Sequence, residues 1–127
     1  MATPPARILV VDDEPQVLEL VRCLLEEEGH EVSTAAGGAE ALDLIGLSRP
    51  DLVILDLMMP GMSGEEVCAR LKADPSTCDI PVVVLTGKRS ESAAVNSFEL
   101  GAADYVRKPF GPKELIARVE ARLKASM

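Results

Sequence analysis

The sequence predicts an α/β fold in which a doubly wound sheet of five parallel strands has helices on both faces. Short, β-branched apolar runs alternate along the chain with segments whose apolar residues recur at helical spacing. Most of these runs are continuously apolar, which is typical of a parallel sheet that is buried on both faces. A length of 127 residues is common for one domain, so we expect a single domain over residues 1–127 with a frayed start at residues 1–6.

The predicted strands follow the short apolar runs. Four of them are plainly apolar, while the second is more polar, as expected for a strand at the edge of the sheet. The predicted strands are residues 8–11, 31–35, 52–55, 82–86 and 105–106.

The predicted helices lie between these strands and after the last one. An apolar stripe runs from Val17 to Leu25 at helical spacing, and Gly29 follows where a helix C-cap is expected. Weaker patterns predict helices over residues 38–45, 65–73 and 92–100. The last helix begins near Pro112, a residue that suits the first helical position. Its inner stripe consists of Leu115, Ile116, Val119 and Leu123.

Composition and charge exclude several classes of function. A net charge of −8 disfavours contact with a phosphate backbone, so we expect no direct binding of nucleic acid by this domain. No apolar run approaches the roughly 20 residues that cross a bilayer, so we expect no membrane contact. Cys23, Cys68 and Cys78 lack metal-binding spacing and indicate free thiols in a reducing compartment, which predicts a cytoplasmic protein.

Polar side chains follow four of the predicted strands, where ligand sites form in open α/β sheets. Asp12 and Asp13 follow the first strand, and Asp56 follows the third. Thr86 ends the fourth strand, and Lys108 follows the fifth. Each has an ordinary structural explanation when taken alone, as a helix cap, a turn residue, a strand residue or a solvated lysine. Because the expected sheet brings these strand ends to one edge, we expect the side chains to lie together.

Three carboxylates at one edge require positive charge. Each pair of carboxylates would repel by about 4 kcal/mol at about 4 Å in a partly solvated site. A few carboxylates together with water suit Mg²⁺, and Lys108 supplies a second positive charge. A carboxylate beside a dication, an ammonium and the Thr86 hydroxyl is suited to stabilise a phosphoryl group. The sequence therefore predicts a Mg²⁺-dependent site for phosphoryl transfer.

Four segments resemble the motifs of the response-regulator receiver family. They are VVDDEP at 10–15, DLMMPGMSG at 56–64, LTG at 85–87 and GAADYVRKPF at 101–110. The resemblance covers essentially the whole chain. It implies a flavodoxin-like (βα)5 fold with the strand order 2-1-3-4-5, for which a chemotaxis member of the family is a known example.

The resemblance implies a role for each site residue. Asp56 matches the phosphoacceptor, which receives its phosphoryl group from a phosphohistidine on a sensor histidine kinase or a histidine phosphotransfer domain. Lys108 matches the lysine that pairs first with the free carboxylate and then with the phosphoryl group. Asp13, Asp56 and the backbone carbonyl of Met58 match the direct Mg²⁺ ligands. Asp12 matches the carboxylate that acts through a metal-bound water.

The resemblance also implies a conformational switch. Thr86 and Tyr105 match a pair in which the hydroxyl moves toward the phosphoryl group and the aromatic ring turns inward. The surface that responds consists of the predicted helix 92–100, the fifth strand and the last helix, and it contacts a downstream protein or effector domain. The bond between Lys108 and Pro109 matches one that is typically cis in this family.

Receivers that dimerise through this responding surface often use charged pairs between protomers. Asp104 and Arg118 match one such pair. Glu114 matches half of a second pair, but Ala94 replaces its basic partner, which weakens the expectation of a homodimer.

Two other classes of function compete with this interpretation. A pseudo-receiver binds partners without phosphorylation, but here every acid and the lysine are present. An aspartate-nucleophile phosphatase also uses Mg²⁺ on a doubly wound fold, but it carries an Asp-x-Asp pattern after its first strand, whereas Asp12 and Asp13 are adjacent. We therefore expect a signalling switch that catalyses only its own phosphorylation and dephosphorylation, not an enzyme.

Overall fold

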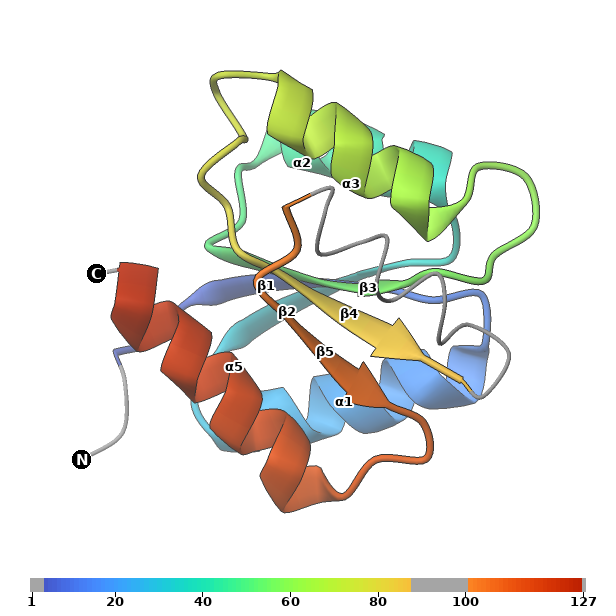
Figure 1. The fold of residues 1–127 in the computed structure, drawn as a ribbon. Coiled ribbons are helices and arrows are strands. Elements are labelled where there is room, and N and C mark those ends of the chain that lie inside the picture. Colours follow the sequence, from blue (N-terminus) through green and yellow to red (C-terminus); the bar gives the residue numbers. More distant parts are fainter. Residues whose placement is uncertain (1–3, 88–100, 127) are drawn as a thin grey trace.

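The computed structural model describes residues 4–87 and 101–126, and within them strands and helices alternate (Figure 1). The strands are β1 (Arg7–Val11), β2 (Glu31–Ala35), β3 (Leu52–Asp56), β4 (Val82–Thr86) and β5 (Asp104–Arg107). The helices are α1 (Pro15–Glu27), α2 (Gly38–Leu47), α3 (Gly64–Ala73) and α5 (Pro112–Ser126). The helix expected at residues 92–100 lies outside the described residues, as does Ala94.

The strands form one parallel sheet in the order β2-β1-β3-β4-β5, which confirms the predicted topology. In this sheet Val11 of β1 is level with Leu55 of β3, so the residues that follow them, Asp12 and Asp56, lie side by side. Thr86 at the end of β4 is level with Arg107 at the end of β5. The register therefore brings the four strand ends that carry the candidate residues to the same edge.

Helices cover both faces of the sheet (Figure 1). Along β1, Leu9 and Val11 face the core under α2 and α3, while Ile8 and Val10 face the core under α1 and α5. Every residue of β3 is buried, as expected for the central strand of a sheet that is covered on both sides. The apolar runs of the sequence therefore form two cores that hold the strand ends in place.

Local signals in the sequence explain where the helices begin and end. Pro15 occupies the first turn of α1, and Gly29 after this helix has a φ of +92°, a conformation that glycine adopts without strain. The Ser63 side chain accepts a hydrogen bond from the Glu66 backbone N–H at 3.2 Å and so caps α3. Among the described residues, no helix is long and apolar enough to span a membrane.

The fifth strand is longer than predicted. It runs over Asp104–Arg107, whereas the apolar pattern supported only residues 105–106. The difference arises because β5 pairs with β4 through its backbone along all four residues, while only Val106 is buried. Strand pairing thus extends beyond the apolar signal at this edge of the sheet.

Candidate functional site

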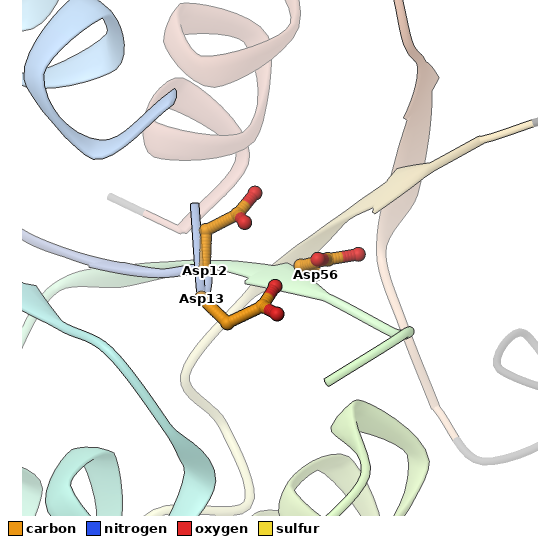
Figure 2. A group of neighbouring side chains, drawn as sticks. All are labelled: Asp12, Asp13 and Asp56. Atoms are coloured by element: carbon orange, nitrogen blue, oxygen red, sulfur yellow. The ribbon is translucent and has the colours of Figure 1, made fainter. Parts of the chain in front are cut away.

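Asp12, Asp13 and Asp56 lie together at the carboxyl edge of the sheet, and Figure 2 shows their side chains gathered in one place. One carboxylate oxygen from each residue lies within 4.8 Å of the other two. Asp12 and Asp56 are buried, with exposed fractions of 0% and 4%, whereas Asp13 is exposed. The cluster therefore combines two buried carboxylates with one that faces solvent.

Lys108 brings an ammonium group to these carboxylates. Its Nζ lies 2.7 Å from Asp12 Oδ2 and 3.6 Å from Asp56 Oδ2. The lysine side chain is only 18% exposed. The peptide bond between Lys108 and Pro109 is cis, as the resemblance implied. The residues predicted after β1, β3 and β5 thus meet in one site.

Backbone N–H groups orient the two buried carboxylates. The Glu14 N–H donates to Asp12 Oδ1 at 2.9 Å, and the Met58 N–H donates to Asp56 Oδ1 at 3.1 Å. Each contact links an aspartate to the residue two positions later, an arrangement that fixes the carboxylate from its own loop. The second oxygen of each aspartate faces Lys108.

Within the part of the chain that the structure describes, the site holds more negative than positive charge. Burial, followed by the nearby charge of Asp12, raises the pKa of Asp56 to about 6, although Lys108 and the Met58 N–H act in the opposite direction. Burial also lowers the pKa of Lys108, but its hydrogen bond to Asp12 and the charges of Asp56, Asp12 and Glu14 outweigh this effect and raise that pKa above its usual value. Among the described residues, one ammonium is shared by several acids, and the charge of Asp56 is the least compensated.

This donor set fits a hard divalent cation. Oxygen ligands from two or three carboxylates, completed by water, are the coordination that Mg²⁺ prefers in proteins. The exposed Asp13 gives such an ion access from solvent, and a dication would relieve the charge imbalance at Asp56.

Gly64 is a residue of this site that the sequence reasoning missed. A Cβ atom at Gly64 would lie 2.3 Å from the Asp56 carbonyl oxygen and 2.7 Å from Leu57 Cα. The Gly64 N–H also donates to the Leu57 carbonyl at 3.2 Å. Only glycine allows α3 to begin so close to the end of β3. The available signal was its place directly after the capping residue Ser63.

The two residues of the predicted switch pair lie on the neighbouring strands β4 and β5. Thr86 occupies the last position of β4, and Tyr105 lies on β5 level with Val84. Tyr105 is 40% exposed, so its ring is at the surface in this structure. Its expected inward turn stays a prediction.

The charged pair that was expected between two protomers forms within one chain. Arg118 Nη1 lies 2.6 Å from Asp104 Oδ1, and Arg122 Nε lies 3.7 Å from the other oxygen of the same carboxylate. The use of Asp104 and Arg118 between two chains stays a prediction.

Curated relatives match nearly all of this chain. The DNA-binding response regulator MtrA of Mycolicibacterium smegmatis is 48% identical over 124 residues, which cover 98% of this chain and 53% of the relative. The phosphate regulon transcriptional regulatory protein PhoB of Pseudomonas aeruginosa is 44% identical over 117 residues, covering 92% and 51%. The chain therefore spans about half the length of these relatives.

These relatives contradict the partners expected from composition. The negative charge led us to exclude nucleic acid, yet MtrA is described as a DNA-binding response regulator. Net charge describes only the matched half of such a protein, so it cannot exclude nucleic acid as a partner of a protein of this kind. A histidine kinase as phosphoryl donor remains consistent with these relatives.

Solved structures and a family model agree with the relatives. The receiver domain of NtrX from Brucella abortus superimposes with a TM-score of 0.87 at 36% identity, covering 92% of this chain and 98% of that one. The model of the response regulator receiver domain matches residues 8–120. This chain therefore belongs to the response regulator receiver family, the signalling switches of two-component systems.

Proposed function

We propose that Asp56 is the phosphoacceptor and that its phosphorylation by a phosphohistidine depends on Mg²⁺. The observation that carries this proposal is the buried Asp56 carboxylate, which lies beside Asp12, Asp13 and the Lys108 ammonium. The raised pKa of Asp56 supports it, because strongly perturbed carboxylates in a charged pocket cluster at functional sites.

The chemistry assigns a separate task to each side chain. An Asp56 oxygen attacks phosphorus, and the bond from phosphorus to the histidine nitrogen breaks. The electron pair of that bond goes to the nitrogen, and because the other ring nitrogen carries a proton, the histidine leaves as the neutral imidazole. Lys108, which is next to Asp56, then donates a hydrogen bond to a phosphoryl oxygen. The Thr86 hydroxyl provides a further donor. Attack of water on the acyl phosphate reverses the modification.

Four residues of this chain would hold the metal. Asp13, Asp56 and the backbone carbonyl of Met58 are the proposed direct ligands, and Asp12 acts through a water molecule. When bound, Mg²⁺ supplies the positive charge that offsets the carboxylates and the phosphoryl oxygens.

The phosphoryl group would act on the rest of the domain through Thr86 and Tyr105. It adds roughly 1.5 to 2 negative charges, which attract the Thr86 hydroxyl, and the exposed Tyr105 ring then turns inward.

We propose that residues 1–127 form one domain and that its catalytic activity is confined to its own phosphorylation and dephosphorylation. The thiols of Cys23 and Cys78, which form no disulfide, support a cytoplasmic location.

Acetyl phosphate labelling tests this proposal. We expect intact-mass measurement to show an adduct of about 80 Da on the wild-type protein with Mg²⁺, and none on Asp56→Asn. Asp13→Ala is expected to lose most of the labelling, because it lacks one proposed metal ligand. The exposed variant Asp43→Asn serves as the matched control and is expected to label like the wild type. Full labelling of Asp56→Asn, or of the wild type without a divalent ion, would contradict the proposal.

A further inference from the structure

Glu14 is a fourth acid at the site, and the proposed chemistry gives it no task. Its Oε1 lies 3.4 Å from Lys108 Nζ, within hydrogen-bonding distance. The Glu14 side chain is 57% exposed, so it lies at the solvent edge of the pocket, while Asp12 and Asp56 lie inside. Glu14 therefore contacts the Lys108 ammonium from the solvent side.

The backbone of Glu14 is held in place by contacts on both sides. Its N–H donates to Asp12 Oδ1 at 2.9 Å. Its carbonyl accepts from the N–H groups of Val17 and Leu18 at 3.0 and 3.2 Å, because Glu14 is the N-cap residue of α1. The carboxylate thus extends toward Lys108 from an ordered part of the backbone.

The hydrogen bonds of Lys108 are directed away from the phosphoacceptor. The ammonium donates to Asp12 at 2.7 Å and to Glu14 at 3.4 Å, whereas Asp56 Oδ2 lies at 3.6 Å, an ion-pair distance. A phosphoryl group on Asp56 needs the same ammonium. A phosphoryl group on Asp56 would therefore compete with Glu14 for this ammonium.

We infer that Glu14 restrains Lys108 in the unphosphorylated protein and so slows phosphorylation of Asp56. The inference rests on the proposed function of Asp56 and Lys108. Glu14 is a positioning residue, since it acts through Lys108 and needs no contact with the phosphoryl donor. Its contact with Lys108 is largely solvated, so its loss is expected to change a rate by about two- to fivefold.

The first test measures initial rates of acetyl phosphate labelling by intact mass at saturating Mg²⁺. Glu14→Gln keeps the shape and the backbone contacts but removes the charge, and we expect it to label about two to five times faster than the wild type. Glu27→Gln is the matched control. It makes the same charge change at the far end of the 13-residue helix α1, roughly 18 Å away and beyond the screening length of about 10 Å at 0.1 M salt. We expect it to label at the wild-type rate.

The second test repeats the comparison of labelling rates in proteins that carry Lys108→Ala. This comparison distinguishes an effect through the Lys108 ammonium from a merely structural role of Glu14. If Glu14 acts through the ammonium, adding Glu14→Gln to Lys108→Ala leaves the residual rate unchanged. A gain that persists without Lys108 would show that Glu14 repels the donor or affects the metal directly, and would overturn the inference. Calorimetric titration with Mg²⁺ confirms that each variant is saturated.

The outcomes separate this inference from the proposed function. A wild-type protein that labels normally, with Glu14→Gln labelling at the same rate or more slowly, would overturn the inference alone. A wild-type protein that does not label at all would overturn the proposed function and the inference with it.

Discussion

At the scale of single residues, the site places a carboxylate where its own charge is unfavourable. Asp56 is 4% exposed, has Asp12 as a neighbour, and receives only a distant ion pair from Lys108. These surroundings raise its pKa from 3.8 to about 6. A folded-state pKa above the unfolded value means that Asp56 favours folding when protonated. This contribution is complete below about pH 3.8 and is lost as the pH rises through about 6.

The first prediction concerns this pH dependence in metal-free protein. At pH 7 to 8 with a chelator, Asp56→Asn is expected to increase the free energy of unfolding by about 1–3 kcal/mol, because the amide carries no charge. At pH 4.5 the difference between variant and wild type should be much smaller. Urea denaturation across this range measures it, with exposed Asp43→Asn as control. A difference that does not vary with pH would refute this account of Asp56.

At the scale of elements, the start of α3 is fitted to the end of β3. The Ser63 cap fixes where the helix begins, and Gly64 allows its first turn to touch the Asp56 carbonyl. The loop that carries the Met58 carbonyl lies between these two points. The position of a proposed metal ligand thus depends on a glycine that takes no part in the chemistry itself.

The second prediction follows from this close contact. Gly64→Ala is expected to destabilise the protein by about 1–3 kcal/mol, since its Cβ would meet backbone atoms that must shift. Gly46→Ala in α2 is the matched control, because its Cβ would enter open space. It should stabilise the protein by about 0.5–1 kcal/mol through the helix preference of alanine. Urea denaturation measures the change in the free energy of unfolding for each variant. Equal changes in both variants would contradict the packing argument.

Elements with strong local signals were predicted from the sequence. Strand ends and site residues that depend on contacts between distant parts of the chain were missed. The apolar runs of β1, β3 and β4 identified their strands because both faces of the sheet are covered. The ends of β5 were missed, since backbone pairing with β4 leaves no apolar signal there. Gly64 and Glu14 were also missed as site residues. Their importance arises from distances to Asp56 and Lys108, which no spacing along the chain reveals.

At the scale of the whole molecule, the two cores and the strand register bring residues that are distant in sequence together at one site. Asp12 and Lys108 are 96 residues apart in sequence, yet their side chains form a hydrogen bond of 2.7 Å. The site exists only in the folded chain, so a cation that binds there must stabilise the fold.

The third prediction concerns that linkage. Mg²⁺ at about 100 times its dissociation constant is expected to increase the free energy of unfolding by about 2.7 kcal/mol. Asp13→Ala should lose most of this gain while it keeps its metal-free fold, because Asp13 is exposed. Urea denaturation with and without Mg²⁺ provides the measurement, and NaCl at matched ionic strength is the control. The same gain in Asp13→Ala would remove Asp13 from the proposed ligands.

The position of the site in the sheet also affects which strands are able to shift. β3 is fully buried at the centre of the sheet, flanked by β1 and β4, so the base of Asp56 is anchored on every side. In the described sheet β2 forms one edge and β5 the other; there β5 pairs with β4 alone and exposes Tyr105. A displacement is therefore accommodated more easily in the edge strands than at the anchored base of Asp56, so this carboxylate keeps its place while the rim of the sheet adjusts.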